Sequence, residues 1–398
     1  MKNNKEENTI KAVEKREVVL KRLDEQIENL RKNDFVLNFF VLDSKNVPNS
    51  GMAYIYNMAY TLKEKGYKVR MVYQLDNEYS AGELAELQSK GKMPDEERKF
   101  IGVGDWMGEK YMELEHLNIQ KEEWRVGPAD FLFIPEAFSS LMFRTFKTHI
   151  PCKRYVILQN FDYVTEFIPI GKQWASYGIK DVVASNELQA NLINEVFPYT
   201  KPYTTVIPPY IHPMFRKPIT AKQLAVNIIA KNPDDVNRIV QPFYWKYPNY
   251  KFVSFRDLRN LPMETFAERL KDGAFTVWVD EKTPFGYGGL EAIKSGSILI
   301  GRIPENIPEW MNDDNGVWFN NINEVPEILA NFVGMWMRDR IPEEITNAME
   351  ETAKHYTYDE WSENLDKFMD KIKEERIKDF ILVKSMDTTN VKTEEENK

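Results

Sequence analysis

The chain has few of the residues that build covalent or metal-bound cores. Its 398 residues include one cysteine, Cys152, and four histidines that lie far apart in the sequence. A single cysteine excludes an intramolecular disulfide bond and a cysteine-built zinc site, and it is typical of proteins from a reducing cytoplasm. Because the histidines do not have the spacing of metal ligands, we expect no metal site.

Long apolar runs are also absent. No segment approaches the roughly 18 consecutive apolar residues that span a bilayer, and residues 1–11 lack the apolar core of a secretion signal. We therefore expect a cytoplasmic protein whose membrane contact would be peripheral. The 53 Lys and Arg are outnumbered by 62 Asp and Glu, for a formal charge of −9. Nucleic acid is not an expected partner, because neutralising phosphates needs clustered basic residues.

Core-forming residues, in contrast, are abundant. Hydrophobic residues make up 42% of the chain, which excludes a mostly disordered protein. Single hydrophobic cores stop growing at roughly 250–300 residues. The length therefore predicts two domains.

Residues 1–34 predict a charged helical extension. Val13, Leu20 and Ile27 are seven residues apart, and a leucine follows each of the last two after three residues. This spacing is typical of a short coiled coil, and equally of a helix that packs one stripe on its own domain. The first alternative would make the chain a homo-oligomer through its N-terminal helix.

Residues 35–215 predict a first α/β domain. A continuous apolar run at 35–42 indicates a buried strand, and a loop rich in turn residues leads to a helix at 52–65 and a strand at 68–73. Units of this kind build right-handed parallel sheets. Further strands are predicted at 130–134, 154–158, 181–184 and 204–207, and the charged stretch 74–127 is predicted to be an insertion with one or two helices.

Residues 216–345 predict a second domain of the same class. Strands at 224–229, 250–254, 275–279 and 298–300 alternate with helices at 234–247 and 263–272 and from residue 289. The fold class is therefore α/β, with two Rossmann-like, doubly wound domains facing a cleft and an N-terminal helical extension. Residues 379–398 are expected to form a polar tail.

The segment 278–309 carries the most informative pattern. After a strand comes a Pro-Phe-Gly turn, and a helix opens at Gly288-Gly289. Free N–H groups and the helix dipole make such a start an anion site, and glycines let a phosphate approach the backbone. Glu291, in the first turn, can accept hydrogen bonds from the vicinal hydroxyls of a sugar. Phosphate donors beside a diol acceptor indicate a nucleotide-sugar site. Two other interpretations stay open. The glycines would also allow close packing of the helix on the sheet, and Glu291 could be a carboxylate at a helix start that the helix dipole stabilises.

This segment resembles the GT-B glycosyltransferases, most of all family 4. That family carries two glutamates in the frame E-x-F-G-x-x-x-x-E-A, and residues 283–292 here are TPFGYGGLEA. Glu291 matches the second glutamate, whereas Thr283 replaces the first, which in the family contacts the donor sugar. Thr283 keeps one hydrogen-bonding group at this place, and Glu281 lies two residues earlier.

The resemblance extends to other parts of the chain and implies roles for single residues. It implies a loop at Gly51 that faces the donor phosphates, closing helices at 346–378 that cross back to the first domain, and phosphate ligands at Lys231 and Arg256. It implies that Glu136 or Asn160 takes the place of the family's acceptor-side histidine. The implied catalytic residues are Lys231, Thr283 and Glu291, and the donor-binding residues are Gly51, Arg256, Phe285, Gly286, Tyr287, Gly288 and Gly289.

Together these observations predict a hexosyltransferase-like enzyme. It would move a sugar from a nucleotide diphosphate donor to a hydroxyl acceptor, a glycan or lipid-linked glycan, with retention of configuration and no cofactor besides the donor. One alternative is a non-catalytic GT-B-like protein for binding or assembly, because Thr283 replaces a glutamate. Another is a viral-type glycosyltransferase that acts on modified DNA bases, for which the basic stretch 144–154 and the pair Arg216-Lys217 are candidates.

Overall fold

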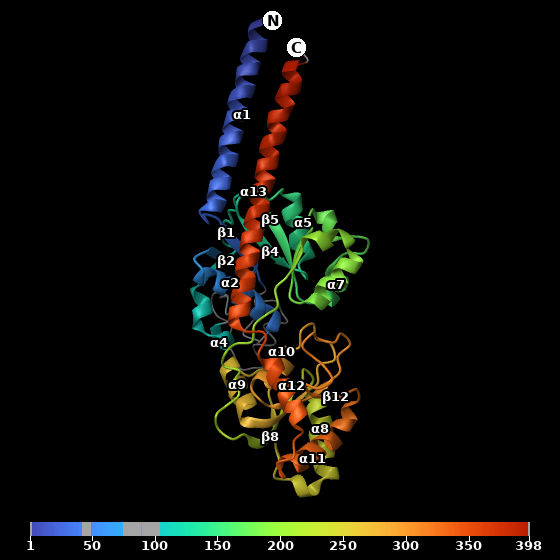
Figure 1. Cartoon of the computed structure of the whole chain (residues 1–398). Coiled ribbons are helices and arrows are strands. Elements are labelled where there is room, and N and C mark those ends of the chain that lie inside the picture. Colours follow the sequence, from blue (N-terminus) through green and yellow to red (C-terminus); the bar gives the residue numbers. More distant parts are fainter. Residues whose placement is uncertain (1, 42–48, 75–88, 90–103, 397–398) are drawn as a thin grey trace.

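The chain builds two parallel β-sheets stacked along the long axis of the molecule, with a pair of helices extending from one end (Figure 1). This computed structural model describes residues 2–41, 49–74, 89 and 104–396. Most of the loop expected before Gly51 and most of the insertion expected at 74–127 therefore lie outside the described residues. The sheets have the strand orders β3-β2-β1-β4-β5-β6-β7 and β12-β11-β10-β8-β9.

The first sheet has the doubly wound order expected from its β-α-β units. Strand β1 pairs in parallel with β2 on one side and with the central strand β4 on the other. The strands are β1 (Val36–Phe40), β2 (Lys68–Tyr73), β3 (Glu115–Asn118), β4 (Phe131–Pro135), β5 (Lys153–Leu158), β6 (Asp181–Ala184) and β7 (Thr204–Val206). The helices are α2 (Ser50–Glu64), α4 (Gly104–Met107), η1 (Glu109–Glu113), α5 (Ser139–Lys147), α6 (Phe161–Phe167), η2 (Trp174–Tyr177), α7 (Glu187–Val196) and η3 (Pro198–Tyr203).

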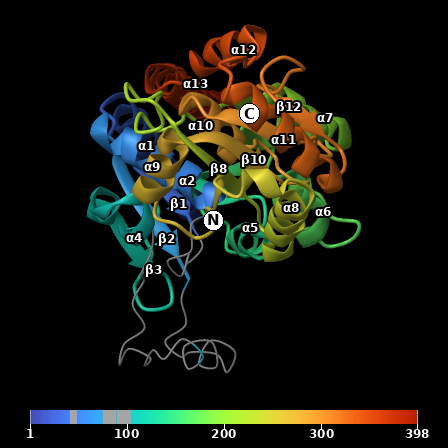
Figure 2. The same ribbon diagram turned by 90° about the horizontal axis from the view of Figure 1, so that it is seen from below.

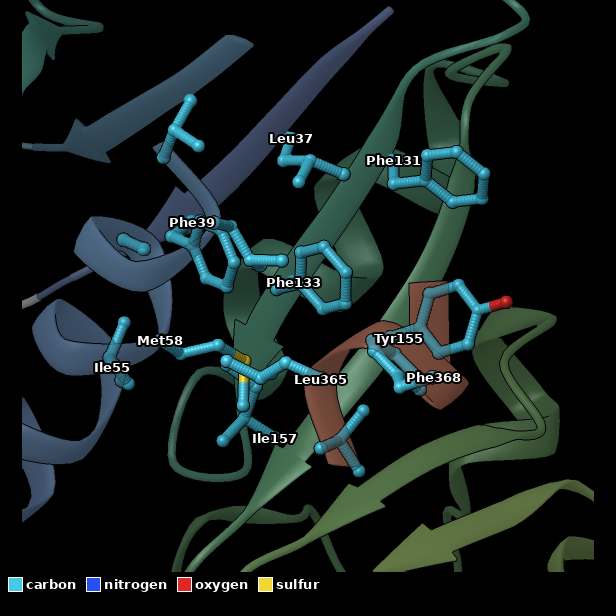
Figure 3. Packing of buried hydrophobic residues seen from close by; sticks show 14 of the residues in the cluster. Leu37, Phe39, Ile55, Met58, Phe131, Phe133, Tyr155, Ile157, Leu365 and Phe368 are labelled. Atoms are coloured by element: carbon cyan, nitrogen blue, oxygen red, sulfur yellow. The ribbon is translucent and has the colours of Figure 1, made fainter. Parts of the chain in front are cut away.

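The core on one face of this sheet is aromatic and includes the C-terminal helix. Phe39 of β1 and Phe133 of β4 stack with ring centroids 4.6 Å apart. Ile55 and Met58 of α2 approach the same strands, and so do Leu365 and Phe368 of α13 (Tyr358–Glu396) (Figure 3). The last helix of the chain thus completes the core of the first domain, because the first sheet has apolar residues on both faces to bury.

The second sheet is smaller and also parallel. Helices α8 to α12 surround its strands β8 and β10 (Figure 2). The strands are β8 (Gln223–Ile229), β9 (Ser254–Asp257), β10 (Gly273–Trp278), β11 (Ile298–Arg302) and β12 (Val317–Phe319). The helices are α8 (Pro233–Lys246), η4 (Pro248–Tyr250), α9 (Met263–Asp272), α10 (Tyr287–Lys294), η5 (Ile322–Glu324), α11 (Val325–Trp336) and α12 (Glu343–Ala353).

Two sequence predictions about elements are wrong. The strand expected at 250–254 starts only at Ser254, because a 3₁₀ turn at 248–250 uses its first residue. The polar tail expected at 379–398 is helical as far as Glu396, because α13 continues along α1 (Lys2–Arg31). Phe380 of α13 is buried, and Lys384 forms an ion pair with Asp24 of α1 at 2.5 Å. Among the described helices, none has the length and apolar content that a membrane span requires.

Candidate functional site

The two domains meet where α7 and α10 begin, at the carboxyl ends of their sheets. Asn186, which precedes α7, donates a hydrogen bond from Nδ2 to the carbonyl of Pro284, at 2.8 Å. In return, Oε1 of Glu309 from the second domain accepts from the N–H of Leu188, also at 2.8 Å. In parallel α/β folds, ligands bind at the carboxyl ends of strands. The segment from Pro284 to the start of α10 therefore lies against the first domain.

The start of α10 is built by a turn that Thr283 closes. The Gly286 N–H donates to Oγ1 of Thr283 at 2.8 Å, and Gly286 has a left-handed backbone with φ +76°. No side chain caps the helix. The N–H groups of its first turn have no intrahelical acceptor, so this end of α10 carries partial positive charge. Thr283 thus shapes the turn, where the resembling family has a glutamate.

The glycines of this turn are required by packing. A Cβ on Gly286 would lie 2.9 Å from Cζ2 of Trp310, and a Cβ on Gly289 would lie 2.8 Å from Cη2 of the same ring. A Cβ on Gly288 would approach Ile229 to 3.2 Å. Close helix–sheet packing therefore explains Gly286 and Gly289 without any ligand. A role in phosphate binding stays a prediction.

Phe285 is a core residue, and its predicted contact with a donor stays a prediction. Its ring is buried and packs on Tyr287 and Tyr356, with centroids 4.9 and 5.4 Å away. Its carbonyl accepts a hydrogen bond from Nε1 of Trp310 at 2.6 Å. Sequence alone could not show this, because Trp310 lies far along the chain.

Glu291 lies one turn into α10, on the same face as Tyr287. Burial raises the pKa of Glu291 to about 8. The pKa of Tyr287 is raised mainly by burial and further by Tyr54, Glu291 and Tyr210. Tyr54 belongs to α2, and Tyr210 follows the first sheet, so this face of α10 looks onto the first domain. Near neutral pH the Glu291 carboxyl is mostly protonated and can both donate and accept hydrogen bonds.

Lys231 follows β8 and reaches the segment that leads to α10. Its ammonium group donates to the carbonyl of Lys282 at 3.2 Å and lies 3.7 Å from Oδ1 of Asp280, while its side chain is 75% exposed. Burial raises the pKa of Asp280, and Lys231 counteracts this rise. Glu281 forms an ion pair with Arg302 at 2.7 Å. Glu281 is therefore engaged and does not replace the missing first glutamate.

Arg256 is not part of this site, which corrects its predicted role. It lies on β9, and its guanidinium group donates to Gln223, the first residue of β8, at 2.8 Å. It also lies 3.8 Å from Asp272, the residue before β10. These partners mark the amino end of the sheet, opposite Lys231. At the carboxyl end of β9, Arg259 is held on Asp257, with two hydrogen bonds from Nε at 3.0 and 2.9 Å and two more from its backbone N–H and Nη2.

The first-domain candidates come together at the ends of β4 and β5. Oε1 of Glu136 accepts from the N–H groups of Asn160 and Gln159, at 2.7 and 3.2 Å. Burial raises the pKa of Glu136 to about 7, although these hydrogen bonds oppose the rise. Asn160 caps α6 through Asp162, at 3.1 Å. Gly51 faces Gln159, whose Oε1 would lie 3.1 Å from an added Cβ. Glu136 is only 2% exposed, so it holds the 159–160 turn from the interior of the domain.

A cavity of about 740 Å³ lies elsewhere, between the connection at 208–209, the 309–314 loop, α12 and the start of α13. Trp310, Tyr356 and Trp361 are among its walls. None of the predicted site residues lines it. The cavity therefore belongs to the connection between the domains.

No family model and no curated protein matches the chain. Solved structures with the GT-B fold match the chain over both domains. Sucrose-phosphate synthase from Thermosynechococcus elongatus aligns with a TM-score of 0.56 and 9% identity, over 85% of this chain and 99% of that chain. A glycosyltransferase from Rickettsia africae aligns with a TM-score of 0.54 and 11% identity, over 86% of this chain and 99% of that chain. Anabaena HepE in complex with UDP aligns with a TM-score of 0.54 and 9% identity, over 85% of this chain and 100% of that chain. The predicted fold class, two Rossmann-like domains, is confirmed.

Proposed function

We propose that this protein is a glycosyltransferase that moves a sugar from a nucleotide diphosphate donor to a hydroxyl acceptor. The observation that carries the proposal is the uncapped start of α10, with Glu291 one turn further on and the first domain opposite. The GT-B fold supports it, and one protein of this fold, Anabaena HepE, is in complex with UDP. The TPFGYGGLEA frame extends the proposal to family 4 and to transfer with retention.

The donor would lie on the second domain. Its diphosphate accepts hydrogen bonds from the N–H groups at the start of α10. It also approaches the ammonium group of Lys231, which is exposed, donates to the carbonyl of Lys282 and lies 3.7 Å from Asp280. Both groups stabilise the negative charge that grows on the departing diphosphate. Glu291 binds the vicinal hydroxyls of the ribose or of the sugar. Thr283, whose oxygen accepts from Gly286, keeps its hydroxyl hydrogen for the donor sugar.

The acceptor would dock on the first domain, beside the turn at 159–160. Asn160 is half-buried there, and the buried Glu136 holds the backbone on which it stands. Two exposed aromatic side chains follow this turn on α6, where the carbonyl of Phe167 accepts a hydrogen bond from Ser139 at 2.6 Å. They are Tyr163 and Phe167, 44% and 43% exposed. Aromatic faces of this kind suit a glycan or a lipid-linked glycan at a membrane surface.

One observation favours the alternative of a non-catalytic protein. Thr283 closes the α10 turn through its own hydrogen bond, so the site is structurally complete without the first glutamate of the family frame. A non-catalytic protein that binds a nucleotide sugar would have the same turn.

The other alternative function, a glycosyltransferase that acts on modified DNA bases, has less support. Arg144, Lys153 and Arg154 of the stretch 144–154 are engaged within the chain: Arg144 donates to Gln74 at 2.8 Å, Lys153 lies 3.3 Å from Asp181, and Arg154 donates to Thr145 at 3.2 Å. Few of their charges are left to bind phosphates.

Calorimetry with UDP and GDP, followed by hydrolysis of a panel of nucleotide sugars, tests the proposal. We expect one nucleoside diphosphate to bind with micromolar to submillimolar affinity and its sugar conjugate to be slowly hydrolysed. Binding without hydrolysis or transfer would favour the non-catalytic alternative. Absence of binding at millimolar concentration to every nucleotide tried would refute the proposed function.

A further inference from the structure

The proposed function leaves one carboxylate beside the predicted diphosphate site without a role. Asp280 follows β10 and precedes Thr283, whose hydroxyl oxygen closes the turn at the start of α10. Oδ1 of Asp280 lies 3.7 Å from the ammonium group of Lys231, and Oδ2 accepts a hydrogen bond from Nε1 of Trp278 at 3.2 Å. The side chain of Asp280 is only 16% exposed, whereas that of Lys231 is 75% exposed. The carboxylate is therefore fixed by the indole, while the ammonium group that it attracts reaches solvent.

Other charged groups near this end of the second sheet are paired with one another. They are Glu281 with Arg302, Lys282 with Glu305, and Asp257 with Arg259. Among the described residues, the cation that acts on Asp280 is Lys231. An effect of pH that depends on Asp280 can therefore be assigned to this one pair.

Lys231 cannot fully neutralise Asp280 and a diphosphate at the same time. In the free protein its charge balances the carboxylate, and in the complex it would balance the charge of the diphosphate. An ionised Asp280 would then repel the phosphates, because unit charges a few ångströms apart interact strongly where solvent is partly excluded. A neutral Asp280 leaves the whole charge of Lys231 to the phosphates.

We propose that Asp280 is a proton-linked counter-ion of the diphosphate site, so that protonation of its carboxylate and binding of a diphosphate favour each other. The proton comes from solvent and goes to Oδ1, because Oδ2 keeps the hydrogen bond from Trp278. Lys231 then turns from the neutral carboxyl to the phosphate oxygens, and the proton is released when the diphosphate leaves. Asp280 is a positioning residue, since it acts through the charge of Lys231. The inference rests on the proposed function, because it requires a diphosphate at this place.

The environment of Asp280 gives the sign of this coupling. Burial raises its pKa, and Lys231 and the hydrogen bond from Trp278 oppose the rise. Negative charge brought to Lys231 offsets the larger of these two opposing effects, so the pKa of Asp280 is higher in the complex than in the free protein. A diphosphate therefore binds with full strength below the pKa that Asp280 has in the free protein. Its affinity falls as the pH rises through that value and levels off above the pKa of the complex.

The effect of pH on UDP binding tests the inference. Asp280→Asn keeps the shape of the side chain and an acceptor for Trp278, and it imitates the protonated carboxyl. We expect the dissociation constants of wild type and variant to be equal near pH 4.5. Near pH 8.5 we expect the variant to bind UDP about threefold to tenfold more tightly, which is the Coulomb effect of unit charges roughly 6 Å apart in a largely solvated site. The ratio of the two constants cancels the titration of UDP itself.

Calorimetry in two buffers of different ionisation enthalpy counts the protons directly. At the pH where the ratio rises most steeply, we expect the wild type to take up about a quarter to a half of a proton more per UDP than Asp280→Asn, as linkage requires for this change in affinity. Glu281→Gln is the matched control, because Glu281 is the next residue and pairs with Arg302 instead of Lys231; it should keep the wild-type pH trend. A second neutral variant, Asp280→Ser, should reproduce the behaviour of Asp280→Asn.

The results separate this inference from the proposed function. Absence of UDP and GDP binding to the wild type would refute both. If GDP alone binds, the same measurements are made with GDP. Binding with a ratio that does not change with pH, or equal proton counts in wild type and Asp280→Asn, would overturn the role of Asp280 and leave the proposed function intact.

Discussion

The sharpest test of the site is the effect of pH on Glu291. Burial raises its pKa from 4.5 to about 8, so the folded protein keeps a proton that the unfolded chain releases. Stability therefore falls as pH rises through 4.5 and levels off above pH 8. The difference corresponds to roughly 4–5 kcal/mol at about 1.36 kcal/mol per tenfold change in acidity. Screening of a partly exposed side chain reduces this to roughly 2–4 kcal/mol.

The substitution Glu291→Gln keeps the shape of the side chain and replaces the carboxyl group, which can ionise, by an amide, which cannot. Near pH 4.5 we expect its free energy of unfolding to equal that of the wild type, because Glu291 is protonated there. At pH 9 we expect the variant to be more stable by roughly 2–4 kcal/mol. Urea unfolding at half-unit steps of pH measures both values, and the titration of Glu136 cancels in the difference. Glu268→Gln, at an exposed position of α9 in the same domain, is the matched control and should show no such trend.

Glu291→Ala, in contrast, should bind nucleotide diphosphate more weakly, because it removes the group that would exchange hydrogen bonds with a diol. A pH-independent difference in stability between Glu291→Gln and wild type would refute the buried, protonated state of Glu291. Unchanged nucleotide binding together with the expected stability profile would leave the burial intact and show that Glu291 does not contact the donor.

Three further predictions concern the surroundings of the site. Gly289→Ala should lower the free energy of unfolding by roughly 1–3 kcal/mol, because its Cβ would lie 2.8 Å from Trp310; an unchanged melting temperature would contradict the packing role. Lys231→Ala should weaken UDP binding about tenfold, a typical loss for one charge-assisted contact, and leave the melting temperature unchanged, since the side chain is 75% exposed. Asn186→Ala should remove the hydrogen bond to Pro284 and increase amide exchange at the domain contact; protection equal to wild type would show that the bond contributes nothing there.

Much of the fold could be predicted from local sequence patterns. The continuous apolar run before residue 42 and the turn residues after it indicated β1 and the start of α2, because buried parallel strands and helix starts have local signatures. Strands β3 and β12 were missed. Each has only three or four residues at a sheet edge, too few to produce a pattern. The helical course of residues 379–396 depends on α1, which is more than 340 residues distant, so composition alone suggested a tail.

The site was predicted in outline and misjudged in detail for a related reason. Thr283, Gly286 and Glu291 lie together because they are neighbours in one turn and helix. The roles of Gly289 and Phe285, however, depend on Trp310, which comes from a different loop. Arg256 seemed suitable because it is basic and close to a predicted strand end. The shift of β9 by a few residues placed it on the strand, with its side chain directed to the opposite end of the sheet.

The helix pair at the tip also has a consequence for synthesis of the chain. Helix α1 leaves the ribosome well before its partner α13, since they occupy residues 2–31 and 358–396. At about 5–20 residues per second, α1 waits roughly 20–80 s for the helix that covers it. Only a chain translated as far as α13 can form the helix pair, and a chain terminated before residue 358 lacks one of the two helices. Closure of the helix pair therefore waits until both domains have been synthesised.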